Sequence, residues 1–283
     1  MSGLATALRA ELFVAVRNWK IGLLLLAPAA ASLIRLLLIR INNASTSLKQ
    51  SLSGGSTVPN IDYAYGYFVD ALATGLVFIY LLFIALAAYS FAIDRDHGIV
   101  RHLVIRQSSR RAVISAKIIT LHGMAILAFI TVFIVSVGLC GLLWDFGPVV
   151  EDGYELISVA EIHTEIRTGI ALALLPLPAC LCLGLLLSVL ANSALQAVTF
   201  ALGLTLLLDI FKNAIGNSAH YLYIYFQPSL LDNSYLHEVA RIVRGFSDIL
   251  VDEHIMQLNY WLPIPQAILF LFVAMVLVRR KSL

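Results

Sequence analysis

Six long apolar runs, separated by polar segments, organise this sequence. The runs cover residues 21–39, 68–93, 118–143, 168–190, 194–211 and 261–278. A helix of roughly 20 apolar residues crosses the ~30 Å hydrocarbon core of a bilayer, and each run is about that long. Helices also satisfy their own backbone hydrogen bonds in lipid. The pattern therefore predicts an all-α, polytopic membrane protein with six transmembrane helices.

The polar connections between these runs differ in length and composition. Only Ala191, Asn192 and Ser193 separate the fourth run from the fifth, which predicts a tight helical hairpin. Residues 42–60 are rich in Ser, Asn and Gly and carry too little apolar surface to form a core, so a loop is expected there. A second hydrophilic loop is expected between the third run and the fourth.

The first 20 residues carry a stripe of apolar side chains. Leu4, Leu8, Leu12, Ala15 and Trp19 recur at the spacing of one helix face, with charged residues elsewhere on the helix. This pattern favours a helix that lies in the membrane interface. A cytosolic tail is the alternative interpretation.

Residues 212–260, between the fifth and sixth runs, form neither a span nor an ordinary loop. The aromatic stretch 221–226 ends before Pro228, which favours an element that enters the membrane and returns. Beyond it, apolar side chains recur at helical spacing opposite charged ones, which predicts an amphipathic helix at the outer surface. The apolar positions are Leu236, Val239, Val243, Phe246 and Leu250.

Composition supports the membrane interpretation. Of the 283 residues, 60% are hydrophobic and 13% are charged, and the mean hydropathy is +0.89. Soluble domains carry about 25% charged residues. The formal net charge of +2 gives no support to nucleic-acid binding. Cys140, Cys180 and Cys182 lie inside apolar runs, where cysteine serves as a small packing residue.

Lys and Arg are unevenly distributed between the two sides of the membrane. Six spans place both termini on one side, and that side collects 12 Lys and Arg residues. The other side has 6, or 7 with Arg35. Because cytoplasmic segments carry the excess of positive charge, we expect both termini and residues 94–117 in the cytoplasm.

The strongest local signal is the charged segment 94–117, which joins the second run to the third. It opens with an acidic and basic cluster and a glycine, continues as a short apolar helix, and ends in basic residues. This order resembles the signature of the type 2 ATP-binding-cassette exporter permeases. The matching positions are Asp94, Arg95, Asp96, Gly98, Leu103, Val104, Ser109 and Arg110. Ile99 replaces a Thr of the family, and Gln107 and Ser108 replace Pro-Val, which leaves the helix end less sharply defined.

The resemblance implies that this segment forms a coupling helix that docks on an ATPase subunit. Arginine side chains would supply donors for acidic grooves on that partner. The candidate docking residues are Asp94, Arg95, Asp96, Gly98, Arg101, Leu103, Val104, Arg106, Arg110 and Arg111. A loop that is basic only because it faces the cytoplasm is the alternative.

The resemblance also implies an energy source and an assembly. The sequence has no GxxxxGK(S/T) phosphate loop, so we expect no cofactor on this chain; ATP and Mg would be bound by a separate ATP-binding-cassette ATPase. We therefore expect a transport subunit rather than an enzyme. Its other partners would be membrane lipids and a second membrane subunit, in a homodimer or a related heterodimer. The expected location is the bacterial cytoplasmic (inner) membrane.

Charged residues within the apolar runs are costly in lipid and are candidates for function. Arg35 and Asp70 fall at similar depth near the outer side and could pair, either as a structural ion pair or in contact with substrate. Asp209 precedes Lys212 by one helical turn and could pair with it or face the transport pathway.

Two further groups of side chains bear on the site. Tyr221, Tyr223, Tyr225 and Phe226 fit an interfacial aromatic belt, and the family resemblance implies that this region closes an outer gate. The seven histidines show no close ligand spacing such as HxxxH, so no metal site is expected.

Two other classes of function are less well supported. A secondary transporter would need polar residues in broken helices near the midplane, which are sparse here. An intramembrane lipid-modifying enzyme would need catalytic spacings such as HExxH or GxSxG, which the sequence lacks.

Overall fold

The computed structural model describes residues 2–52, 64–99, 109–151, 154–231, 234–246 and 252–280. Within them, six helical segments are long and apolar enough to cross a membrane. They are Trp19–Lys49, Ala64–Asp96, Arg110–Leu143, Val159–Leu190, Ala194–Tyr221 and Glu253–Arg279. The predicted all-α polytopic architecture is confirmed.

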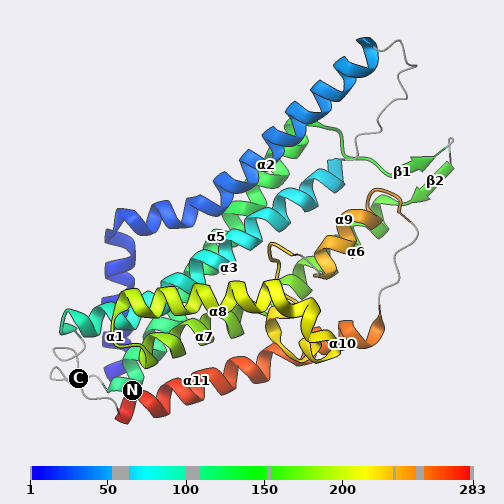
Figure 1. Ribbon diagram of the computed structural model, residues 1–283. Helices are drawn as coiled ribbons and strands as arrows, with labels where there is room; N and C mark the ends of the chain where they lie inside the picture. The colour runs from blue at the N-terminus through cyan, green and yellow to red at the C-terminus, as the bar shows by residue number, and fades with distance from the viewer. Residues whose placement is uncertain are drawn as a thin grey trace.

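The helices form one elongated bundle, with a small hairpin at one end (Figure 1). In chain order, the helices of its first half are α1 Ser2–Arg17, α2 Trp19–Leu52, α3 Ala64–Asp96 and α5 Arg110–Leu143. Then follow strands β1 Val149–Glu151 and β2 Tyr154–Ile157, and helices α6 Val159–Leu174, α7 Leu177–Leu190 and α8 Ala194–Ile215. The remaining elements are the short 3-10 helices η1 Gly216–Tyr221 and η2 Tyr223–Tyr225, then α9 Tyr235–Ile242, α10 Glu253–Trp261 and α11 Pro263–Arg280.

Helices α3 and α7 form the centre of the bundle. Most residues of α7 are buried, and it packs against α3 on one side and α11 on another. The α3–α7 approach is close because Gly184 has no side chain: a Cβ there would lie 2.8 Å from the carbonyl oxygen of Ile84. Helices α2, α5 and α8 pack against α3, and α8 also packs against α7.

The two ends of the bundle contain different elements of the fold. One end, here called the basic end, holds α1, the end of α3, the start of α5, the α7–α8 turn and the end of α11. The first residues of α1 and the last residues of α11 lie there (Figure 1). The other end, here called the far end, holds the β hairpin, α9 and α10. That this end faces the cytoplasm stays a prediction.

Helix α2 extends well beyond the predicted span. The loop predicted from residue 42 is wrong for residues 42–52, which continue the helix to Leu52. Local side chains explain why polar residues remain helical here. The hydroxyl groups of Ser45 and Thr46 donate to the carbonyl of Asn42 at 2.8 and 2.9 Å, one turn back along the helix. Residues 53–60 of the predicted loop lie outside the described residues.

A β hairpin occupies part of the hydrophilic segment after α5. Strands β1 and β2 pair antiparallel, with Val150 opposite Glu155. Helix α6 then begins with a capping box: Ser158 Oγ accepts from the backbone N–H of Glu161, and the Glu161 carboxylate accepts from the N–H of Ser158. The helix that contains the fourth span therefore begins at residue 159, nine positions before the apolar run that predicted the span.

The fourth span is broken between α6 and α7. Pro176 has no N–H to donate to the carbonyl of Leu172, one turn earlier. Asn259 Nδ2 on α10 donates to that carbonyl instead, at 3.3 Å, and Tyr80 Oη on α3 donates to the neighbouring carbonyl of Ala173 at 2.7 Å. Side chains from two other helices thus satisfy the backbone at the break, as lipid requires.

The amphipathic helix after the aromatic stretch is shorter than its sequence pattern. Helix α9 ends at Ile242, and Gly245 adopts a φ of 85°, which ends the helical conformation. Its apolar face is fully buried: Leu236 and Val239 pack against α6, so α9 rests on protein rather than alone in the interface. Leu250 of the predicted stripe lies outside the described residues.

Candidate docking surface at the basic end of the bundle

The acidic and basic cluster that opens segment 94–117 forms the last turn of α3. The helix ends at Asp96, and His97 and Gly98 turn away from it. Gly98 adopts a φ of 71°, and its N–H donates to the carbonyl of Arg95 at 2.9 Å. Glycine suits this position because a side chain would strain the left-handed conformation.

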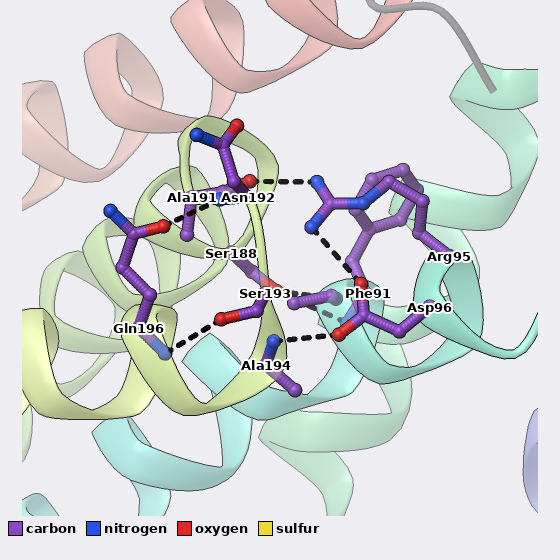
Figure 2. Close-up of polar contacts among 10 residues, drawn as sticks. Phe91, Arg95, Asp96, Ser188, Ala191, Asn192, Ser193, Ala194 and Gln196 are labelled. Carbon is purple, nitrogen blue, oxygen red and sulfur yellow. Dashed lines mark hydrogen bonds and ion pairs between the residues drawn. The ribbon is translucent and has the colours of Figure 1, made fainter.

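Arg95 joins the end of α3 to the α7–α8 turn. Its Nη1 donates to the carbonyl of Ala191 at 2.8 Å, and its Nη2 donates to Asp96 Oδ1 at 3.3 Å (Figure 2). Only 12% of the Arg95 side chain is exposed. Arg95 therefore directs its donors into the protein, toward the carbonyl of Ala191, the residue that follows α7.

Asp96 makes the complementary contact with the start of α8. Its Oδ2 accepts from the backbone N–H of Ala194 at 2.8 Å (Figure 2). Ser193 Oγ caps the same helix by accepting from the N–H of Gln196 at 3.2 Å. A carboxylate at a helix N-terminus is also favoured by the helix dipole. One acidic and one basic residue of α3 thus hold both halves of the α7–α8 turn.

Ser188 adds a third connection one turn deeper. It is fully buried in α7, and its Oγ accepts from the N–H groups of Phe91 and Ala92 at 3.2 and 2.9 Å (Figure 2). Together with the Arg95 and Asp96 contacts, this bond fixes the α7–α8 turn to the end of α3. The two segments form one braced unit.

Lys117 connects α5 to this region. Its side chain is 3% exposed, and its Nζ lies 2.5 Å from Asp94 Oδ2 on α3 and 2.8 Å from Glu11 Oε1 on α1. The cluster carries two acids and one base, so its formal charge is −1. The sequence did not single out Lys117 or Glu11, because neither follows a motif and their pairing depends on how α1 packs on α5.

Arg110 connects the start of α5 to the end of α11. Its Nη1 donates to the carbonyls of Val278 and Arg279, both at 3.3 Å. Ser109 caps α5 by accepting from the N–H of Ala112 at 3.1 Å. Arg111, by contrast, is exposed. The candidate docking residues Arg101, Leu103, Val104 and Arg106 lie outside the described residues, so the short docking helix stays a prediction.

Arg35 and Asp70 do pair at the far end, but Arg35 is the weaker of two partners. Arg35 Nη2 lies 3.7 Å from Asp70 Oδ2, and the Arg35 side chain is 48% exposed. Arg244 donates from Nη2 to Asp70 Oδ2 at 2.6 Å and from Nη1 to Asp70 Oδ1 at 3.4 Å. Sequence reasoning missed Arg244 because it is 174 positions from Asp70.

Asp209 and Lys212 form the second predicted pair. Lys212 Nζ lies 2.9 Å from Asp209 Oδ1, and both side chains are almost completely buried. The ammonium group also donates to Ser229 Oγ at 3.0 Å. Both partners face the interior of the protein, which is the arrangement of a structural ion pair.

The candidate gate residues divide between interior and surface. Tyr223 and Phe226 are buried, whereas Tyr221 is 58% exposed and Tyr225 is half-buried. Gln266 on α11 holds the stretch from both sides of Leu222: its Oε1 accepts from the N–H of Tyr223, and its Nε2 donates to the carbonyl of Tyr221. Burial raises the pKa of the Tyr223 phenol well above its ordinary value, so it stays neutral.

No cluster of His, Cys, Asp or Glu within the described ranges could hold a metal ion. His163 instead lies beside Tyr65, with Nε2 and Oη 2.9 Å apart. His220 packs edge-on against the Tyr225 ring, at 4.5 Å between ring centroids.

The fold and these sites define the chain as an all-α polytopic integral membrane protein. In comparisons with known proteins, no family model matches the chain, and neither a curated protein nor a solved structure does.

Proposed function

We propose that this chain is the membrane-spanning permease subunit of an ATP-binding-cassette exporter. In this proposal it lies in a bacterial cytoplasmic membrane with both termini in the cytoplasm. A separate ATPase subunit binds ATP and Mg, and a second membrane subunit, identical or related, completes the substrate pathway. The support is the order of elements along the chain and the signature in segment 94–117.

The observation that carries the proposal is the bracing within that segment, on both sides of residues 98–109. Before these residues, Arg95 and Asp96 join α3 to the α7–α8 turn. After them, Arg110 joins α5 to the end of α11. A soluble partner that pushes on the residues between Gly98 and Ser109 therefore pushes on spans two to six together. A loop that is basic only for topological reasons has no need of such connections.

The same contacts divide the candidate residues into two roles. Arg95, Asp96 and Arg110 donate or accept inside the protein, so they transmit displacement rather than touch the partner. Arg101, Arg106 and Arg111 then remain to contact the ATPase. At the far end, the stretch from Tyr221 to Phe226 serves as the outer gate, held to α11 by Gln266.

Affinity purification of the tagged chain from its native membrane tests the docking role. An ATPase with a phosphate loop should co-purify with the wild type and be lost with Arg106→Glu, because reversing the charge repels an acidic groove. Lys49→Glu is the matched control, since it changes the same charge near the far end of α2. Retention of the ATPase by Arg106→Glu, with unchanged ATP hydrolysis, would contradict docking at this segment.

A second variant separates docking from transmission. Arg95→Gln should keep the ATPase bound, because Arg95 faces the α7–α8 turn, but should abolish stimulation of ATP hydrolysis by the membrane subunit. Transport that continues without any ATPase would instead support a secondary transporter.

A further inference from the structure

An apolar cavity of about 530 Å³ lies in the far half of the bundle, between α3, α5 and α6. Aromatic rings form its walls: Tyr65 and Phe146 lie 4.7 Å apart between centroids, and Phe68 meets Phe133 edge-on at 5.7 Å. Its volume and apolar lining are those of a small-molecule site. Nothing in the proposed docking mechanism uses it.

Two polar side chains of α6 stand on one side of this cavity. Arg167 and His163 are one helical turn apart, both line the cavity, and both are exposed. Within the described part of the chain, no carboxylate pairs with Arg167. His163 Nε2 is hydrogen-bonded to Tyr65 Oη, whereas its Nδ1 has no hydrogen-bond partner in the described part of the chain. The polar side of the cavity therefore carries an uncompensated positive charge.

The α5 wall of the cavity is partly exposed on the outside of the bundle. Phe133 and Val137 of α5 line the cavity yet are each 37% exposed, and the adjacent Ile134 is 63% exposed. These residues lie inside the third span, two to three turns before it ends at Leu143. A hydrocarbon chain in the adjoining leaflet can thus reach the cavity without crossing water.

We infer that this cavity binds one anionic phospholipid, with an acyl chain between the aromatic walls and the phosphate at Arg167. Arginine pairs with phosphate through two parallel N–H donors. The apolar depth favours a lipid over a free phosphate, and the unpaired cation favours an anionic head group over a zwitterionic one. This inference does not depend on the proposed function, because the site lies at the end away from the docking segment.

Native mass spectrometry of the full chain in detergent tests the inference. Phosphatidylglycerol should be retained as one molecule per chain, phosphatidylcholine with the same acyl chains should bind more weakly, and glycerol phosphate should not bind. Arg167→Gln should weaken phosphatidylglycerol binding about tenfold, the loss expected for a hydrogen bond to a charged group. Its affinity for phosphatidylcholine should fall less, because the choline cation already offsets the charge of that phosphate. Arg40→Gln, which removes an exposed cation of α2 that does not line the cavity, should change neither.

A cavity-filling variant completes the test. Ile170→Trp should displace both lipids, because the added ring occupies the space of the acyl chain. Equal binding of phosphatidylglycerol to wild type and Arg167→Gln would overturn the inference. Glycerol phosphate that binds as tightly as the lipid would overturn it too, because the apolar walls would then contribute nothing to affinity. So would a lipid-free dimer that Ile170→Trp converts to monomer, because a second copy would then fill the cavity.

Discussion

Glu11 on α1 and Lys117 on α5 form an ion pair, with 2.8 Å between Oε1 and Nζ, at a site where the lysine is almost completely buried. Asp94 on α3 lies on the other side of the same ammonium group. The pair fixes α1 to the first turns of α5, so the N-terminal helix is attached to the bundle by charge as well as by apolar contact.

Replacing this lysine should destabilise the protein strongly. Lys117→Met leaves two carboxylates facing each other without a counter-charge, and removing one partner of a buried pair costs about 3–5 kcal/mol. Thermal unfolding in detergent should show a large fall in Tm. Glu11→Gln should cost less, because Asp94 still neutralises Lys117. The control is Arg111→Met, an exposed position of the same helix; equal Tm values for Lys117→Met and this control would refute the prediction.

The buried pair at the end of α8 should behave as a unit. Asp209→Asn removes the counter-charge of Lys212 and should cost about 3 kcal/mol or more, even though Ser229 still accepts from the ammonium group. The double variant Asp209→Leu with Lys212→Met should recover most of that loss, because both charges are gone. Denaturant titrations of Asp209→Leu, Lys212→Met and their double variant measure this coupling. If Asp209→Asn changes transport but not stability, the carboxylate acts on the pathway instead.

Two glycines offer a matched test of close helix packing. Gly184→Ala should lower stability by about 1–3 kcal/mol, since its Cβ would meet the Ile84 carbonyl oxygen and the Ala87 side chain, both at 2.8 Å. Gly203→Ala, on α8, meets no atom within 4 Å and should raise stability by up to about 1 kcal/mol through helix propensity. Opposite changes in Tm support the α3–α7 contact, whereas changes of the same sign argue against it.

The two arginine partners of Asp70 should contribute unequally. Arg244→Gln removes two hydrogen bonds to the carboxylate and should cost about 1.5–3 kcal/mol. Arg35→Gln loses only a longer, more exposed ion pair and should cost under about 1 kcal/mol. Double-mutant cycles with Asp70→Asn isolate each pairing energy. A larger coupling for Arg35 than for Arg244 would contradict the geometry.

The spans could be predicted from sequence because crossing a membrane is mostly a matter of local apolar length. The α7–α8 turn could be predicted as well, because only three residues separate the two apolar runs. The extension of α2 could not, because Ser and Thr favour loops by composition yet here donate to carbonyls of their own helix. The β hairpin was not predicted because its acidic residues suggested a solvated loop, although the Asp-Gly pair between the strands is a hairpin signal.

The sites were less predictable, because their partners are distant along the chain. Asp209 and Lys212 share one helix face, so their pairing could be anticipated. The partners of Arg244 and Glu11 lie on other elements of the fold, so no local sequence pattern predicts these ion pairs. The signature at Asp94–Asp96 located an organised region. Only the fold showed that Arg95 and Asp96 turn inward to the α7–α8 turn.

The break in the fourth span limits how the bundle can move. A carbonyl left without a donor in lipid costs several kcal/mol. Separating α10 from α6 would strand the oxygen of Leu172, and separating α3 from α6 would strand that of Ala173. These two bonds remove degrees of freedom at mid-bundle. Helices α3, α6 and α10 should therefore move together as one unit. Any transport cycle must use relative motion of other helices.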